Sequence, residues 1–370
     1  MFYFLGLTAP EIFFGAFEFN SEKNDYIKRK IKVNTAVLSS DQPFYLESGE
    51  KLDGIEIAYT TYGELNADKS NVVWICHALT ANANPVEWWP GLVGDHDLIN
   101  PKDYFIVCAN ILGSCYGTTG PQSKKYLNAA NSHSNFPFIT VRDMVNAHIL
   151  LANHLKIDSI YLLMGGSLGG QQAIEWSIAE ASRIKNLFLI ATNAFHSPYG
   201  IAFNESQRLA LLADSTYFIN KDDAAQNGLK AARAIALISY RTYEAYNATQ
   251  RESDLNKTHT FPAAGYQQYQ GDKLVKRFNA YSYYTLSRAM DSHQVGRNRN
   301  SVQDALNSIT AKTLCVGISS DILFPPEEQK FLKDNIPNAR YKEIDSFFGH
   351  DGFLIEVEKI TKLLNSFLQS

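Results

Sequence analysis

The sequence predicts an α/β protein whose mostly parallel sheet is flanked by helices. Five short runs are apolar throughout rather than alternating, which is typical of strands covered on both faces. Segments with helical spacing follow several of these runs, and a glycine-rich turn around a serine follows one of them. The runs are residues 71–78 (NVVWICHA), 104–112 (YFIVCANIL), 160–164 (IYLLM), 187–192 (LFLIAT) and 313–318 (TLCVGI).

The remaining elements of the core are predicted from turn signals and periodicity. Ahead of the first parallel strand, residues 43–46 and 55–62 are expected to pair as a hairpin across the turn-prone segment ESGEKLDG. Residues 141–155 and 353–367 carry apolar side chains at helical spacing. Because such stripes are typical of helices packed on a sheet, we assign these residues to the core and not to a site.

The strand and helix alternation stops between about residues 196 and 306. This stretch is rich in Ala, Tyr, Gln and Arg, its patterns are helical, and it contains no β-rich run. We interpret it as a helical cap inserted between two strands. The predicted organisation is therefore an N-terminal extension (1–32), an α/β-core in two pieces (33–195 and 307–370) and the cap (196–306).

Composition excludes several classes of protein. The chain has 370 residues, a net charge of −4 and 45% hydrophobic residues, which suits one large α/β domain with an insertion or two ordinary domains. The charges are nearly balanced, so the composition gives no indication of a basic surface that would bind nucleic acid. The four cysteines include no C-x-x-C pair, so we expect no zinc site or disulfide framework, and a reducing, cytoplasmic compartment. The apolar N-terminus has no basic residue before Lys23 and is interrupted by Pro10, so neither a signal peptide nor a membrane span is expected.

The glycine-rich turn predicts a nucleophilic serine. Residues 165–169 (GGSLG) match the pattern G-x-S-x-G between a predicted strand (160–164) and a predicted helix (168–178). In this context the pattern indicates a strained turn whose apex exposes the serine hydroxyl, and larger neighbours would collide with the adjoining strand or helix. Ser167 is therefore the candidate nucleophile.

A serine hydroxyl needs a base to act as a nucleophile, and the base needs an acid to orient it. Behind such a turn the partners follow in the order acid, then histidine, each after a later strand. Asp321 follows KTLCVGISS, and His350 follows ARYKEIDS just before the last helix. We therefore expect Ser167, Asp321 and His350 to form a catalytic triad.

Attack on a carbonyl group also requires donors for the developing oxyanion. One candidate is the backbone N–H of Leu168, directly after the nucleophile. The second should come from the loop after the first parallel strand, HALTANAN, where Leu79 is the candidate. His77 in the same loop is interpreted as a structural hydrogen-bonding residue at a strand end.

Separate blocks of sequence then carry a resemblance to one family. They are ICHALT, NILGSCYGTTGP, FPFITVRDMV, GGSLGGQQAIEW, IAFNESQRLALLAD, RFNAYSYYTLSRAMD, DILFPPEEQ and GHDGFLIE, spread from about residue 33 to 367. Together they resemble the homoserine O-acetyltransferase family, a branch of the α/β-hydrolase fold that serves methionine biosynthesis. The resemblance implies a ping-pong reaction: Ser167 takes an acetyl group from acetyl-CoA and passes it to the hydroxyl of L-homoserine. It implies acetyl-CoA as a substrate, no bound cofactor or metal, and a homodimer formed through the cap helices.

The resemblance also implies residues that bind the amino acid. Arg233, in GLKAAR, would hold the substrate carboxylate, together with Tyr240 seven positions later, and Asp351 would hold the ammonium group. One cation and one anion suit a zwitterion that enters a partly dry pocket. Without the resemblance, Arg233 and Tyr240 would be assigned to the surface of an amphipathic helix. The sequence departs from the family pattern at Ala81 and Asn82, where a glycine and an acidic residue are usual.

Other functions stay open at this point. A serine O-acyltransferase or a homoserine O-succinyltransferase would use the same triad, as would an esterase or thioesterase with water as the acceptor. A binding protein on an inactive scaffold would not need the strained serine turn. The tyrosine-rich run 266–284 is a candidate for either the dimer interface or the acyl-CoA tunnel.

Overall fold

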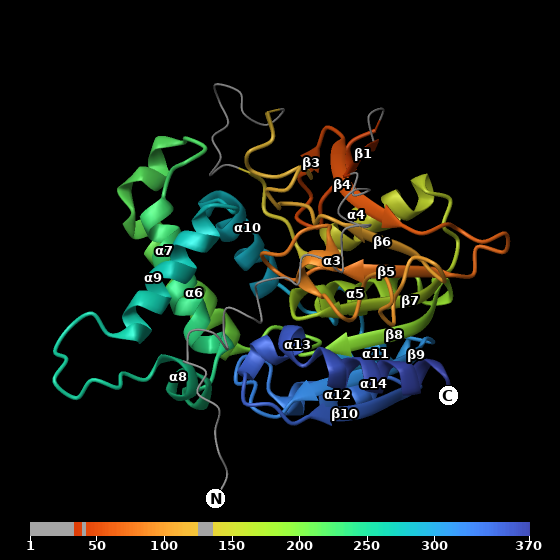
Figure 1. Ribbon diagram of the computed structural model, residues 1–370. Helices are drawn as coiled ribbons and strands as arrows, with labels where there is room; N and C mark the ends of the chain where they lie inside the picture. Colours follow the sequence, from red (N-terminus) through yellow and green to blue (C-terminus); the bar gives the residue numbers. More distant parts are fainter. Residues whose placement is uncertain (1–32, 39–41, 125–135) are drawn as a thin grey trace, which may run out of the picture.

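The computed structural model describes residues 33–38, 42–124 and 136–370 (Figure 1), so the predicted N-terminal extension lies outside the described residues. Eight strands form one sheet in which β5 to β10, six strands, are parallel to one another and β4 is antiparallel to both of its neighbours, β1 and β6. Their spatial order is β1 (Asn34–Leu38), β4 (Ile55–Tyr62), β6 (Phe105–Ala109), β5 (Val72–Cys76), β7 (Ile160–Gly166), β8 (Ile184–Ile190), β9 (Lys312–Ile318) and β10 (Ala339–Ile344).

The central strands are buried on both faces, as their continuous apolar character predicts. Every residue of β5 is buried, and its side chains divide between two apolar clusters, with Trp74 on one face and Ile75 on the other. The face of Trp74 is covered by α4 (Val141–His154), α5 (Leu168–Ala179) and α12 (Pro326–Asn335). The face of Ile75 is covered by α3 (Pro85–Trp88), α13 (Gly352–Ile355) and α14 (Val357–Leu368).

Two local predictions are wrong. The segment ESGEKLDG reverses the chain between β2 (Phe44–Tyr45) and β3 (Lys51–Leu52), whereas β4 pairs with β1 and β6. The turn residues specify where the chain reverses, but not which strand pairs with the long apolar segment that follows. The helix predicted over 353–367 is broken at Glu356, whose ψ of 43° is not helical, into α13 and α14.

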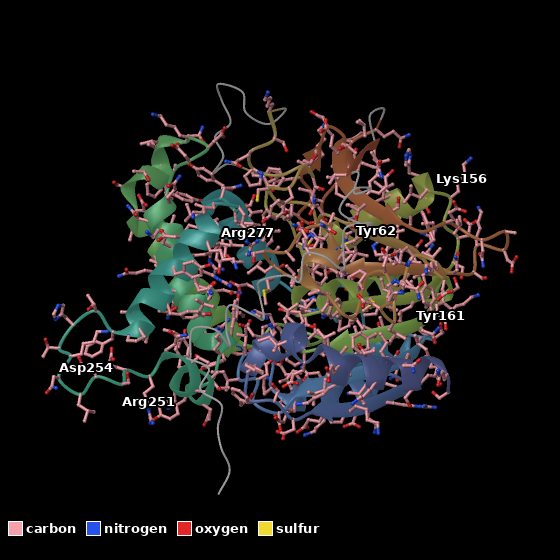
Figure 2. All side chains as sticks on the ribbon, viewed as in Figure 1. Tyr62, Lys156, Tyr161, Arg251, Asp254 and Arg277 are labelled. Carbon is pink, nitrogen blue, oxygen red and sulfur yellow. The ribbon has the colours of Figure 1, made fainter. Side chains whose placement is uncertain are left out.

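Between β8 and β9 the chain forms helices, as the sequence predicts, and we call residues 196–306 the cap. Figure 1 shows the longer cap helices grouped beside the sheet, and Figure 2 shows Arg251 and Asp254 on a loop that extends away from it. The cap helices are α6 (Pro198–Ala213), α7 (Gln226–Tyr240), α8 (Tyr243–Gln250), α9 (Pro262–Val275), α10 (Ala280–Asp291) and α11 (Val302–Asn307).

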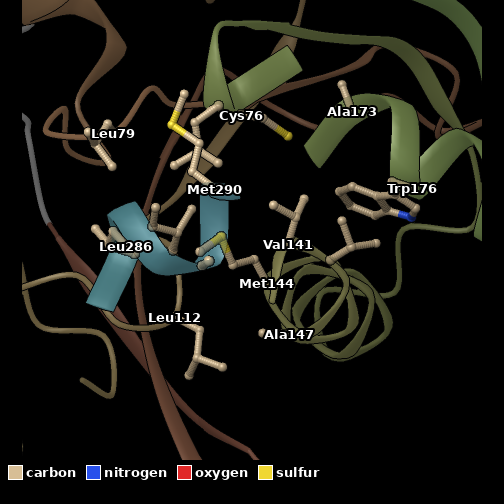
Figure 3. Packing of buried hydrophobic residues seen from close by; sticks show 14 of the residues in the cluster. Cys76, Leu79, Leu112, Val141, Met144, Ala147, Ala173, Trp176, Leu286 and Met290 are labelled. Atoms are coloured by element: carbon tan, nitrogen blue, oxygen red, sulfur yellow. The ribbon is translucent and has the colours of Figure 1, made fainter. Parts of the chain in front are cut away.

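Helix α10 anchors the cap in the core. Leu286 and Met290 of this helix are buried in the same apolar cluster as Met144 of α4 and Leu112 of the loop after β6 (Figure 3). Burial of such side chains stabilises the contact by about 1.5–3 kcal/mol each. The cap is therefore packed on the core and not merely tethered to it.

Backbone contacts without intervening side chains join α5 to the sheet. A Cβ atom on Gly165 would lie 2.3 Å from the carbonyl oxygen of Gly169, and one on Gly169 would lie 2.1 Å from the carbonyl oxygen of Cys76. Both obstacles are backbone atoms, so no side-chain rotation relieves them. The ends of β5 and β7 and the first turn of α5 therefore require glycine at these positions.

No helix in the described ranges has the length and apolar character needed to cross a membrane.

We predict that Gly169→Ala destabilises the protein by about 2 kcal/mol or more, because the added methyl group overlaps the Cys76 carbonyl. The matched control is Gly265→Ala, in α9, where no atom lies within 4 Å of the added Cβ. That substitution should stabilise by about 0.5–1 kcal/mol through helix propensity. Thermal unfolding of both variants measures the contrast. Equal midpoints would contradict the backbone contact at Gly169.

Candidate active site

Ser167 lies in a tight turn between β7 and α5. Its φ of 56° and ψ of −130° are a conformation that a residue with a side chain seldom adopts. Its N–H donates to the carbonyl oxygens of Ile190 and Ala191 at the end of β8, at 3.1 Å each. The contacts of β8 therefore hold this strained turn at the carboxyl end of the parallel strands.

The structure brings Ser167, His350 and Asp321 together. His350 Nε2 lies 3.0 Å from Ser167 Oγ, and His350 Nδ1 lies 2.7 Å from Asp321 Oδ2. The second carboxylate oxygen, Oδ1, accepts the N–H groups of Leu323 and Phe324 at 2.8 and 2.9 Å. When Nδ1 donates to this fixed carboxylate, the lone pair on Nε2 faces the serine hydroxyl. The arrangement suits proton transfer from Ser167 Oγ to His350.

Aromatic rings enclose His350. Phe324 stacks on the imidazole with ring centroids 5.0 Å apart, and Phe353 and Tyr240 lie at 5.2 and 5.6 Å. His350 and Asp321 are only 3% and 2% exposed. Water is largely excluded here, which strengthens the electrostatic contact between these two residues.

The loop after β5 carries one expected oxyanion donor, Leu79, and it contacts the start of α5, which carries the other, Leu168. Gln172 Nε2 donates to the carbonyl oxygens of His77 (3.2 Å) and Leu168 (3.1 Å), which ties the two segments together. The N–H groups of Leu79 and Leu168 have no hydrogen-bond partner among the residues that the structure describes. Two unpaired donors on adjoining segments suit an oxyanion hole.

His77 is a structural residue of that loop. Its Nε2 accepts the N–H of Ile111 at 3.1 Å, so its Nδ1 carries the proton and donates to the Ala78 carbonyl at 2.9 Å. Complete burial lowers the pKa of His77 to about 4, so the ring is neutral and this tautomer is fixed. His77 therefore holds the Ala78–Leu79 peptide and does not itself contact Ser167 Oγ.

Arg233 and Tyr240 lie on the same helix, α7, and Tyr240 faces His350. The guanidinium carbon of Arg233 is 5.5 Å from the centre of the Tyr240 ring. Burial raises the pKa of Tyr240, the charge of Arg233 lowers it and the charge of Asp351 raises it, so both charges lie close to the phenol. Tyr240 thus lies beside the imidazole, and Arg233 and Asp351 lie close to Tyr240.

Asp351 has an internal partner that the sequence did not predict. Its Oδ2 accepts the Nε–H of Arg241 at 2.8 Å, and the two side chains are 16% and 9% exposed. Arg241 also lies over the ring of Tyr266, 5.0 Å from its centre. The arginine directly after Tyr240 was the only hint in the sequence of a charge at this point, but no local pattern indicates that its partner is Asp351, 110 positions away.

Glu328 on α12 is a second acid near the triad. Its carboxylate accepts the side-chain amide N–H of Asn193 at 2.9 Å. The pKa of Glu328 is raised to about 8: burial raises it most, the hydrogen bond from Asn193 lowers it, and the nearby charge of Asp321 raises it. At neutral pH Glu328 is therefore mostly protonated, and Asp321 has no second full negative charge beside it.

A pocket of about 800 Å³ lies where the cap meets the loop after β9. Arg241, Tyr243 and Tyr246 line it from the cap, and Ser320 and Ile322 line it from the core. Ser167 and His350 are not among its lining residues, so it borders the candidate active site without containing it. Within the described part of the chain, no three His, Cys, Asp or Glu side chains are grouped to hold a metal ion.

The sequence matches known proteins over most of its length. Residues 71–356 match the family described as alpha/beta hydrolase fold. A homoserine O-acetyltransferase of Cyclobacterium marinum is 44% identical over 337 residues, which cover 91% of this chain and 96% of that protein.

Solved structures with less similar sequences share the fold. Homoserine O-acetyltransferase from Bacillus anthracis aligns with a TM-score of 0.83 at 21% identity, covering 92% of this chain and 98% of the other. Esterase E22 aligns with a TM-score of 0.82 at 20% identity, covering 91% and 100%. Because a transferase and an esterase match equally well, the architecture alone does not separate the two activities. The relative from Cyclobacterium marinum is 44% identical across nearly the whole length, and the chain belongs to the homoserine O-acetyltransferase family of the α/β-hydrolase fold.

Proposed function

We propose that this protein is a homoserine O-acetyltransferase that transfers an acetyl group from acetyl-CoA to the hydroxyl of L-homoserine. The observation that carries the proposal is a relative of that name, 44% identical across 91% of this chain. The 3.0 Å contact between His350 Nε2 and Ser167 Oγ supports an acyl-serine mechanism.

In the first half-reaction Ser167 Oγ attacks the thioester carbonyl while His350 Nε2 takes the hydroxyl proton. Asp321 holds the imidazole and stabilises its positive charge. The N–H groups of Leu79 and Leu168 stabilise the tetrahedral oxyanion. When the C–S bond breaks, the proton on His350 passes to the sulfur, so CoA leaves as the free thiol and Ser167 is acetylated.

In the second half-reaction the homoserine hydroxyl attacks the acetyl-serine carbonyl. His350 takes the proton of that hydroxyl and returns it to Ser167 Oγ as the ester bond to the serine breaks. The product is O-acetylhomoserine, and the protein returns to its starting state. The same base serves both halves because the CoA sulfur and the homoserine oxygen occupy the same position in turn.

The amino-acid backbone of the acceptor is held by Arg233, Tyr240 and Asp351 in this proposal. The guanidinium of Arg233 suits a carboxylate, and Tyr240 lies between it and the imidazole. Asp351 carries the negative charge for the ammonium group. Since Asp351 also accepts from Arg241, the ammonium group would share this carboxylate with an internal cation.

A homodimer through the cap accounts for an apolar surface at the 800 Å³ pocket. Ile238, Tyr243 and Ile322 line the pocket and are 56%, 78% and 48% exposed. In contrast, Tyr281 and Tyr283 of the tyrosine-rich run are buried inside the cap. The outer faces of α7 and α8 are therefore better candidates for the interface than the start of α10.

We predict that thiol release from acetyl-CoA depends on homoserine and is abolished by Ser167→Ala. The substitution removes the proposed acyl acceptor, so turnover should fall by about 10⁴-fold or more. The measurement is release of free CoA with and without homoserine, with detection of O-acetylhomoserine. Fast release without any amino acid would favour an esterase or thioesterase. Serine as the better acceptor, or succinyl-CoA as the better donor, would favour the related transferases.

We predict that Arg233→Gln raises the KM for homoserine by about 10- to 100-fold, the loss expected for one charged hydrogen bond. The first half-reaction should be unaffected, because it takes place before the amino acid binds. Stopped-flow acetylation of Ser167 and steady-state kinetics separate the two. Arg233→Lys, which keeps the charge, is the matched control, and its KM for homoserine should lie between those of the wild type and Arg233→Gln. An unchanged KM in Arg233→Gln would remove Arg233 from the acceptor site.

We predict that the protein sediments as a dimer and that Tyr243→Lys, combined with Ile238→Lys, makes it a monomer. Two lysines would bring like charges into an apolar contact that is closed by symmetry. Sedimentation velocity at micromolar concentration measures this. Tyr45→Lys, at another exposed tyrosine (67% exposed), is the control and should stay dimeric. A wild-type monomer, or a dimer that survives both substitutions, would contradict the proposed interface.

A further inference from the structure

Arg277 of the cap contacts two core loops. Its Nη1 donates to the carbonyl oxygen of Thr80 and to the Tyr116 hydroxyl (2.9 Å), and its Nη2 lies 3.4 Å from Thr80 Oγ1. These residues come from three separate sequence blocks, RFNAYSYY, ICHALT and NILGSCYGTTGP. Figure 2 shows Arg277 at the boundary between the cap helices and the core.

The loop that Arg277 contacts begins with a tight turn around Leu79. The N–H of Ala81 donates to the Ala78 carbonyl at 3.0 Å, so Leu79 and Thr80 are the two corner residues. His77 Nδ1 also donates to the Ala78 carbonyl, at 2.9 Å. In a trans peptide the C=O and N–H point in opposite directions, so holding the Ala78 carbonyl fixes the direction of the Leu79 N–H.

The peptide on the other side of Leu79 is held in the same manner. The N–H of Ala81 points into the turn, and the carbonyl of Thr80 in the same peptide points out of it, where Arg277 binds it. His77 therefore holds the Ala78–Leu79 peptide group, before the two corner residues, and Arg277 holds the Thr80–Ala81 peptide group, after them. Rotation of the Leu79 N–H would break both hydrogen bonds to the Ala78 carbonyl, one from His77 and one from the Ala81 N–H, and the Ala81 N–H belongs to the peptide that Arg277 holds.

Further carbonyl groups of the loop are held from the core. Trp88 Nε1 donates to the carbonyl of Asn82 at 2.9 Å, and Thr60 Oγ1 donates to the carbonyl of Ala83. His77, Trp88 and Thr60 all belong to the core, whereas Arg277 follows the cap helix α9. One of the two donors that hold the Ala78 carbonyl, the Ala81 N–H, thus lies in a peptide that the cap binds through Arg277.

We propose that Arg277 is a positioning residue that orients the Leu79 N–H and so couples the cap to the oxyanion hole. The inference rests on the proposed acyl-serine function, in particular on Leu79 as an oxyanion donor. It assigns to the cap a role in the chemical step of acylation, in addition to enclosing the substrates. Arg277 itself does not touch the reacting atoms in this proposal.

The test compares acylation of Ser167 by two donors in Arg277→Gln. Acetyl-CoA carries a large phosphorylated group, whereas p-nitrophenyl acetate does not, but both need the same oxyanion hole. We expect the acylation rate constant to fall by about 10- to 30-fold with both donors, which is less than the loss of an oxyanion donor itself. Lys276→Gln removes a neighbouring exposed charge and is the matched control, with no expected change.

Two further measurements separate positioning from a general loss of structure. A small alkylboronic acid forms a tetrahedral adduct with serine, and its inhibition constant should rise by the same factor as the acylation rate falls. Arg277→Lys, or added guanidinium ion with Arg277→Ala, should restore part of the rate. If Arg277→Gln does not fold, Arg277→Lys carries the test, with an expected fall of about 3- to 5-fold with both donors.

The outcomes distinguish the alternatives. A slower reaction with acetyl-CoA alone would assign Arg277 to the phosphate groups of the donor and overturn the positioning role. Unchanged rates with both donors, or unchanged boronate inhibition, would also overturn it. The p-nitrophenyl ester reports acylation of Ser167 without homoserine or CoA, so this test remains decisive even if the natural acceptor is a different molecule.

Discussion

The candidate site depends on direct backbone contact between the first turn of α5 and the ends of β5 and β7. Where Gly169 meets Cys76, the helix approaches the sheet more closely than any side chain would allow. This approach forces the chain through the strained turn at Ser167, which the carbonyls of Ile190 and Ala191 hold in place. The strain, of order 1–3 kcal/mol, is sustained because the surrounding strands determine the conformation from several sides.

The same contact brings two loops of separate origin to one place. Because α5 starts against the end of β5, its first N–H groups lie beside the loop that carries Leu79, and Gln172 links the two. The acid and the base arrive from the far half of the sheet, on the loops after β9 and β10. Parallel strands make this convergence possible, since their carboxyl ends all meet at one edge.

How much was predictable follows from the range of each signal. The buried strands were predictable, because continuous apolar runs indicate burial directly. Ser167, Asp321 and His350 were predictable because each follows the end of a strand in the required order. Strand β1 was missed, since five residues with alternating exposure carry little signal at a sheet edge. The contacts of Arg241 and Arg277 were beyond reach, because their partners lie 110 and 197 positions away with no local pattern to connect them.

The insertion of the cap between β8 and β9 has a consequence for the order of folding. The hydrogen bond between His350 and Ser167 joins residues 183 positions apart, and the whole cap lies between them. Closing so long a segment carries an entropic cost that only later contacts repay. We therefore expect the serine to meet its base at a late stage of folding. Until that contact forms, Ser167 lacks the base that activates its hydroxyl, so its nucleophilicity depends on the longest-range contact of the triad.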